Sequence, residues 1–154
     1  MELKHNKDVS YIIKYFMKLN VISILYALLL FILIEFQVNI YRMIRITGWD
    51  GDQVNTAVTI LSWVFFLFTT GGYIWLTAKW LGPRKLNLLV MLLWLPYFYL
   101  MITVFARLFP ITNPGETPLP AIGLIFLAMI FLYPLYIGLI TWIGSLLGKR
   151  THLI

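Results

Sequence analysis

Four long runs of apolar residues alternate with short polar segments along the chain. Each run is long enough to form an α-helix that crosses a bilayer, for which roughly 20 residues are needed. We therefore predict an all-α, polytopic membrane protein, a bundle of four transmembrane helices that forms one membrane domain over residues 1–154. The predicted spans are residues 21–41, 56–80, 86–108 and 121–147.

A basic, amphipathic segment, residues 1–20, precedes the first span. Lys7, Lys14 and Lys18 fall on one helical face, and the aromatic and aliphatic residues fall mostly on the other. This pattern favours an N-terminal helix that lies at an anionic membrane surface before the chain turns inward. A plain positive flank that sets the orientation of the protein explains the same residues equally well.

The segments between the predicted spans are short. Residues 41–55 are predicted to be a loop with a turn at residues 48–51, and residues 81–85 to be a tight basic turn. Residues 109–120 contain four prolines, Pro110, Pro114, Pro118 and Pro120. Because proline lacks the N–H that an interior helical position needs, this segment is not expected to be a regular helix.

Glu35 is the only acidic residue inside an apolar run. An acidic side chain at the centre of a membrane helix costs about 2.5 to 3.5 kcal/mol, so it usually faces other helices, pairs with a partner or carries a proton. Asn39 and Arg42 follow on the same helical face, and Arg42 is long enough to reach back to the carboxylate. The two interpretations are a locally neutralised structural glutamate and a proton or ligand site.

Three of the predicted helices are interrupted at a similar depth in the bilayer. The third contains Pro96, the fourth contains Pro134, and both prolines are flanked by tyrosines, so we predict kinks there. Interrupted helices near the midplane are a feature of small-molecule and ion sites in transporters, although proline also simply kinks membrane helices. Including the interruption in the second helix, the candidate ligand-binding residues are Glu35, Asn39, Arg42, Thr69, Thr70, Tyr97, Tyr99, Tyr133 and Tyr136.

Glycines in the second and fourth spans predict close helix packing. Gly144 and Gly148 have the small-xxx-small spacing that lets two membrane helices approach closely, within one chain or between two copies. The predicted packing positions are Gly71, Gly72, Gly138, Gly144 and Gly148.

The charges predict an orientation. With the N-terminus inside, nine lysines and arginines lie on the inner side (Lys4, Lys7, Lys14, Lys18, Lys79, Arg84, Lys85, Lys149 and Arg150) and three on the outer side (Arg42, Arg45 and Arg107). We therefore expect a multi-pass protein of a cell membrane, of bacterial origin, with both termini in the cytoplasm. Because the net charge of +6 follows the topology, nucleic-acid binding is not expected.

Composition excludes several kinds of chemistry. The chain is 61% hydrophobic, has no cysteine, and has only two histidines, His5 and His152, which lie in the polar terminal segments. Thiol catalysis, disulfides and a haem or zinc site in the bilayer are therefore not expected. The sequence contains no acid pair, Ser–His pair or phosphate-binding loop, so we predict neither an enzyme nor a cofactor.

Two functions remain open. In the first, which we prefer narrowly, the protein is a non-catalytic accessory, regulatory or immunity-type subunit of a membrane complex, because its loops are too short for a soluble domain. In the second, it is a small dimeric transporter or ligand-binding protein that uses Glu35 and a tyrosine- and proline-lined cavity. Four short spans with one early glutamate resemble the architecture of the small multidrug resistance transporters. The residues around Glu35 lack the small residues that flank the glutamate in that family.

Overall fold

All secondary structure in the computed structural model, which describes residues 2–151 and the side chains of residues 9–149, is helical. Five α-helices and two short 3-10 helices follow one another: α1 (Glu2–Val38), α2 (Ile40–Thr47), α3 (Gly51–Trp80), η1 (Lys85–Leu89), α4 (Val90–Leu108), η2 (Pro114–Glu116) and α5 (Pro120–Thr151). Four segments are long and apolar enough to cross a membrane: Val9–Val38, Gly51–Trp80, Lys85–Leu108 and Pro120–Lys149.

Helix α1 is continuous from Glu2 to Val38. The expected turn between a surface helix and the first span is therefore absent, since α1 passes through Asn20 and Val21 without a break. The physical reason lies in the sequence, because no glycine or proline occurs before Gly48 and nothing interrupts the backbone hydrogen bonds.

The segment predicted to be the first loop is largely helical as well. Helix α2 occupies Ile40–Thr47 and ends at Gly48, whose φ of 68° lies in the left-handed region that glycine adopts without strain. The backbone N–H of Asp50 then donates to Gln53 Oε1 at 3.3 Å, at the start of α3. Three residues, 48–50, connect α2 to α3.

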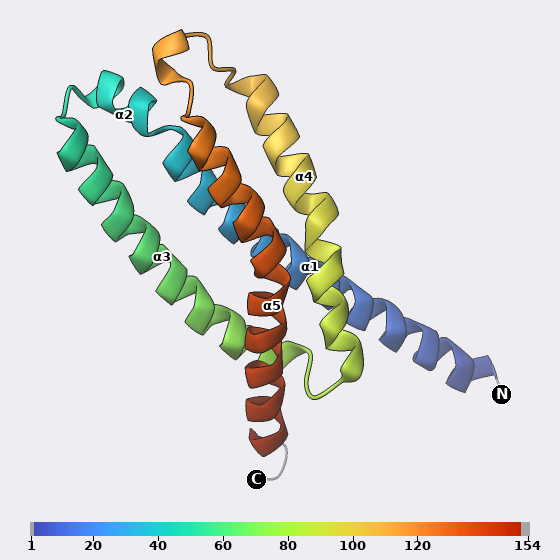
Figure 1. The fold of residues 1–154 in the computed structure, drawn as a ribbon. Coiled ribbons are helices and arrows are strands. Elements are labelled where there is room, and N and C mark those ends of the chain that lie inside the picture. Colours follow the sequence, from blue (N-terminus) through green and yellow to red (C-terminus); the bar gives the residue numbers. More distant parts are fainter. Residues whose placement is uncertain (1, 152–154) are drawn as a thin grey trace.

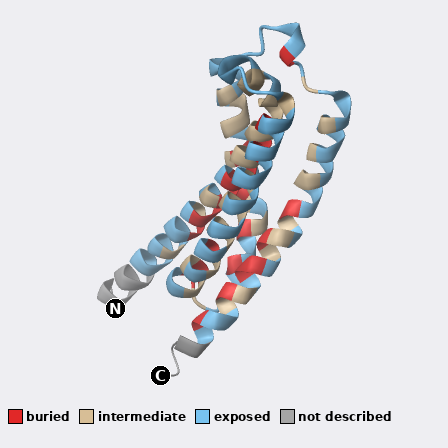
Figure 2. Ribbon diagram, turned by 90° about the vertical axis from the view of Figure 1, so that its left-hand side faces the viewer, coloured by how far each residue is buried: buried red, intermediate tan, exposed pale blue. Residues whose placement is uncertain are grey.

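The helices pack as two pairs, α1 with α4 and α3 with α5 (Figure 1). Both members of each pair run in the same direction. Helix α2 and η2 lie at one end of the helices, called here the α2 end, and η1 lies at the other, called the η1 end. Buried residues are concentrated along the middle of the assembly, whereas the outward helix faces are exposed (Figure 2).

Helix α1 supplies the most strongly buried of the four apolar segments. Its buried residues recur every three or four positions, which is the period of one helical face: Leu19, Ile22, Ser23, Tyr26, Ala27, Leu29, Leu30 and Ile34. Trp94 and Phe98 of α4 belong to the same core, with ring centroids 5.4 Å apart. The apolar outer faces suit a lipid environment, in which such exposure carries no penalty.

The prolines lie inside continuous helices. Pro96 is within α4 and Pro134 is within α5, and each helix extends well beyond its proline on both sides. The kinks remain a prediction from the sequence.

Helices α3 and α5 approach most closely near the η1 end, at two glycines. A Cβ added to Gly144 would lie 2.9 Å from the Ile74 carbonyl oxygen, and one added to Gly148 would lie 2.8 Å from the Ala78 carbonyl oxygen. No larger residue fits at either position without moving the backbone of α3. Toward the α2 end the two helices separate (Figure 1).

The other predicted packing glycines behave differently. An added Cβ at Gly138 would meet the flexible side chain of Met91, whereas Gly71 and Gly72 are exposed with open space where a Cβ would lie. No described helix therefore packs against Gly71 or Gly72, because the face of α3 that carries them points away from the other helices.

Candidate functional site

Glu35 lies in the last turn of α1, where it pairs with Asn39. The Asn39 side-chain amide donates to Glu35 Oε2 and to the Glu35 backbone oxygen, both at 2.9 Å. Asn39 is also the single residue between α1 and α2. The backbone N–H of Asn39 also donates to the Glu35 carbonyl, at 3.1 Å, so Asn39 holds both the backbone oxygen and one carboxylate oxygen of Glu35.

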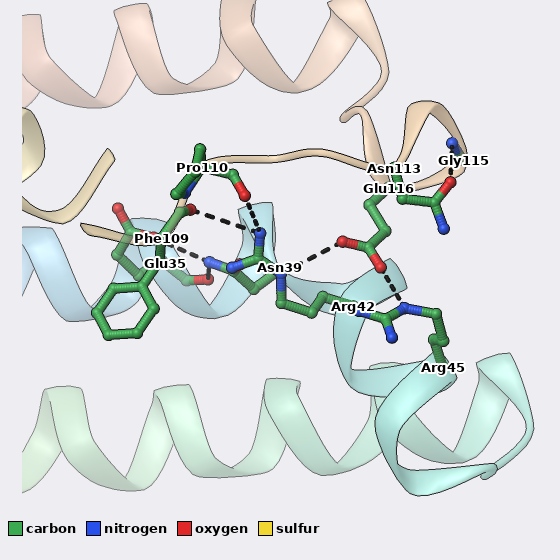
Figure 3. A network of polar contacts seen from close by, with 9 residues as sticks. All are labelled: Glu35, Asn39, Arg42, Arg45, Phe109, Pro110, Asn113, Gly115 and Glu116. Atoms are coloured by element: carbon green, nitrogen blue, oxygen red, sulfur yellow. Dashed lines mark hydrogen bonds and ion pairs between the residues drawn. The ribbon is translucent and has the colours of Figure 1, made fainter. Parts of the chain in front are cut away.

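Arg42 forms its ion pair with Glu116, and no ion pair joins it to Glu35 among the residues that the structure describes. The Arg42 Nε lies 3.3 Å from Glu116 Oε2, and its Nη2 donates to the Pro110 carbonyl at 3.0 Å and to the Phe109 carbonyl at 3.5 Å (Figure 3). The chain is interrupted at Asn39 between the two helices, so the helical spacing assumed for an uninterrupted helix does not hold.

Glu116 is the acid that joins the two loop regions at the α2 end. It is 5% exposed and accepts hydrogen bonds from Arg45 Nε and from Arg42 Nε. The hydrogen bond from Arg45, reinforced by Arg42, holds the pKa of the Glu116 carboxyl below its ordinary value. Asn113 fixes the preceding turn by accepting from the Gly115 backbone N–H at 3.0 Å (Figure 3).

Sequence reasoning missed Glu116 as a site residue. One signal was available, because Glu116 is the sole acid in the proline-rich segment, and the other connection at that end carries Arg42 and Arg45. Two cations and one acid in facing connections favour an ion pair, although their separation of more than 70 residues hides it from any local pattern.

The predicted tyrosines do not converge on one site. Tyr97 donates to Asn20 Oδ1 at 2.5 Å, and Tyr133 donates to the Tyr26 carbonyl oxygen at 2.6 Å. Tyr99 is 74% exposed and points outward, toward lipid in a bilayer. The hydroxyls of Tyr97 and Tyr133 thus hold α4 and α5 to α1.

The predicted threonines form local and interhelical hydrogen bonds. Thr69 donates to the Phe65 carbonyl at 2.7 Å in its own helix. The Thr70 and Tyr136 hydroxyls are 2.7 Å apart, which links α3 to α5. Both threonines are therefore engaged in helix structure.

Four tyrosine rings pack together where α1, α3 and α5 meet. The ring centroids of Tyr26 and Tyr73 are 4.4 Å apart, and those of Tyr133 and Tyr136 are 5.5 Å apart. Tyr73 also donates to the Leu25 carbonyl at 2.7 Å. This tyrosine cluster acts as packed core, since its rings contact one another and three hydroxyls bind neighbouring helices.

A lateral groove of about 400 Å³ lies between α1, α3 and α5, on the side where α3 and α5 separate. It is mostly apolar, with a few polar groups along it. We define the lateral groove by Leu33, Gln37, Thr59, Ser62, Phe66 and Phe126.

One polar atom in the lateral groove lacks a partner. The Ser62 hydroxyl oxygen is buried and has no hydrogen bond to any described residue. An unpaired buried hydroxyl costs about 1 to 3 kcal/mol, and in hydrocarbon no water is present to compensate. The Ser62 oxygen has no exposed surface, so an occupant of the groove bonds to it only after the serine side chain turns toward the groove.

Across the residues that the structure describes, no group of three or more His, Asp or Glu side chains comes together in a way that could hold a metal ion.

Comparison with models of known protein families, with curated proteins and with solved structures finds no match for this chain.

Proposed function

We propose that this protein is a non-catalytic membrane subunit, of the accessory, regulatory or immunity type, that binds a transmembrane helix of another membrane protein in the lateral groove. The proposal rests on one observation, an apolar groove between helices that are long and apolar enough to cross a membrane, with Gln37 and Thr59 in its lining and the unpaired Ser62 hydroxyl buried beneath its surface.

The chemistry of the groove favours a helix over a lipid chain as its occupant. Gln37, Thr59 and Ser62 add hydrogen-bonding groups to an apolar lining. An acyl chain carries no hydrogen-bonding group along its length, whereas a membrane helix brings polar side chains that bond to such groups. Thr59, Ser62 and Phe66 follow one another at spacings of three and four on α3, so they form a ridge suited to helix packing.

The polar residues required by a transporter are engaged elsewhere, which favours the subunit over the alternative. Glu35 pairs with Asn39 at the end of α1. Tyr97 and Tyr133 bind α1, and Tyr136 binds Thr70. A substrate that used these side chains would first have to break these bonds.

Photocrosslinking from inside the lateral groove tests the proposal. A benzophenone amino acid at Ile125, which lines the groove, should form a crosslink to the membrane-spanning segment of one identified partner protein. The same amino acid at Leu124, which is 72% exposed on the neighbouring surface, is the control and should give no such crosslink.

A groove-filling variant makes the test specific. Ser62→Phe should abolish the crosslink from Ile125, whereas Leu61→Phe on the exposed surface of α3 should retain it. A crosslink to a second copy of this chain would replace the proposal with self-association. Absence of any crosslink, together with proton-coupled substrate flux in liposomes, would support the transporter instead.

A further inference from the structure

A second groove, of about 390 Å³, lies at the η1 end between α1 and the turn that leaves α3. Its lining is basic and aromatic, unlike that of the lateral groove. We define this basic groove by Tyr11, Lys14, Tyr15, Lys18, Trp80 and Arg84.

Arg84 is held in position within the basic groove. Its guanidinium carbon lies 4.5 Å from the centroid of the Tyr15 ring and 4.9 Å from that of Tyr11. The Tyr15 hydroxyl donates to Asn87 Oδ1 at 2.6 Å, and Asn87 is 1% exposed. The aromatic platform under the cation is thus anchored to the buried core, which limits the conformations that Arg84 samples.

The turn that carries Arg84 is fixed as well. The Asn87 side-chain amide donates to the Gly82 carbonyl oxygen at 2.6 Å, and Gly82 has a φ of 61°, which suits glycine. The backbone before Arg84 therefore has a defined path, and the guanidinium is presented by a built turn rather than by a loose loop.

The positive charge of the basic groove is not balanced by the acids whose side chains the structure describes. Three cations, Lys14, Lys18 and Arg84, line the groove. The four described acids lie at the opposite, α2 end, in α1 next to α2, at the start of α3 and in η2: Glu35, Asp50, Asp52 and Glu116. Three like charges gathered in one groove favour an anion as its occupant.

The basic groove continues into an apolar stretch of α1. Met17 and Val21 complete its lining and are 63% and 42% exposed, one turn apart along the membrane-spanning segment. An anionic group at Arg84 would therefore stand directly beside an apolar track. This is the arrangement of a phospholipid, whose charged headgroup is joined to acyl chains.

We propose that the basic groove binds the phosphate-bearing headgroup of an anionic phospholipid, with Arg84 facing the phosphate, Lys14 and Lys18 beside it, and an acyl chain along Met17 and Val21. The planar guanidinium matches phosphate oxygens in a two-point hydrogen bond, which a lysine cannot reproduce. The charge bias of the sequence places the η1 end in the cytoplasm, where the leaflet is rich in anionic lipid.

Lipid retention by the purified full-length protein tests the proposal. The protein in neutral detergent is mixed with phosphatidylglycerol or with phosphatidylcholine of identical acyl chains, and bound lipid is counted by native mass spectrometry. Phosphatidylglycerol should be retained in preference. Arg84→Gln should weaken this retention by about fivefold, the factor that one cation near an anionic surface contributes.

Lys79→Gln is the matched control. Lys79 lies at the end of α3 that leads into the Arg84 turn, but it does not line the basic groove, and its Nζ lies 4.8 Å from the centroid of the Trp75 ring. Lys79→Gln removes the same charge and should leave retention unchanged. Arg84→Lys should give an intermediate loss, because it keeps the charge and removes the planar group. Equal losses in Lys79→Gln and Arg84→Gln would overturn the proposal in favour of diffuse charge attraction.

Two further measurements complete the test. A competition with inorganic phosphate distinguishes a lipid from free phosphate, and melting temperatures identify variants that fail to fold. Full displacement of phosphatidylglycerol by an equal concentration of inorganic phosphate would overturn the assignment to a lipid, whereas retention of the lipid supports it. If Arg84→Gln lowers the melting temperature, the exposed Lys14→Gln and Lys18→Gln variants carry the test. Unchanged retention in both of these would also overturn it.

Discussion

The Nε atom of Arg42 lies 3.3 Å from Glu116 Oε2, and this contact joins α2 to η2 across 74 residues of chain. Arg45 donates to the other carboxylate oxygen. One buried carboxylate therefore holds together the two connections that lie beyond the α2 end of the four long helices.

We expect a double-mutant cycle to separate this pair from Glu35. Arg42→Gln and Glu116→Gln should each lower the melting temperature, and their combination should lower it by less than the sum, because the two side chains share an interaction. Arg42→Gln combined with Glu35→Gln should be additive. The reverse result would show that Arg42 is the functional partner of Glu35.

Acid should weaken the contact at Glu116. Its arginine partners lower the pKa of this carboxyl from the ordinary value of 4.5, so its stabilising contribution is complete above that value and is lost as the pH falls through the lowered pKa of the folded state. The melting temperature of the wild-type protein should therefore fall more steeply below about pH 4.5 than that of Glu116→Gln. Asp52→Asn, which removes an exposed acid at the same end, should retain the wild-type slope.

Alanine at Gly144 should destabilise the contact between α3 and α5. Its Cβ would lie 2.7 Å from Thr77 Cβ and 2.9 Å from a backbone oxygen, so we expect a loss of about 1 to 3 kcal/mol in the free energy of unfolding. Gly71→Ala is the control, since it meets open space and should be neutral or stabilising by up to about 1 kcal/mol through helix propensity. If Gly144→Ala and Gly71→Ala change the free energy of unfolding in detergent equally, the close approach of α3 and α5 at Gly144 does not stabilise the protein.

Removing the Tyr133 hydroxyl should cost stability without changing packing. Tyr133→Phe deletes the 2.6 Å hydrogen bond to the Tyr26 carbonyl, with an expected loss of about 1 kcal/mol. Tyr99→Phe, on an exposed face, should have no measurable effect on unfolding. A neutral Tyr133→Phe would mean that ring packing alone holds α5 against α1.

Single cysteines should report the orientation, because the chain has none of its own. Cysteines at the exposed Asp52 and Thr117 should react with an impermeant maleimide added outside intact cells, and one at the exposed Lys85 should react only after lysis. The opposite pattern would invert the topology.

The sequence predicted the long helices better than it predicted what their polar side chains contact. Apolar runs report helix length directly, which is why four membrane-length helices could be expected. Helix α2 was missed because its eight residues are amphipathic and carry no apolar run. The continuity of α1 could have been predicted from the sequence, since its residues include neither glycine nor proline.

The partners of the polar side chains depend on how each helix is rotated about its axis. Tyr97 and Tyr99 are two residues apart, and one binds Asn20 while the other faces outward. Both lie within three residues of Pro96 in α4, so their closeness to the proline did not predict which of them would face the other helices. Such rotations are set by interhelical packing, which the order of residues within one helix does not contain.

The burial of α1 has a consequence for biosynthesis. Its core face packs mainly on α4, and Phe98 of α4 is made roughly 60 residues after α1 ends at Val38. At about 5 to 20 residues per second, the ribosome needs roughly 3 to 12 seconds for that interval. During those seconds the helix that will be most enclosed by protein stands in the insertion machinery or in lipid, with Asn20 and the Tyr26 carbonyl not yet bonded to their tyrosines.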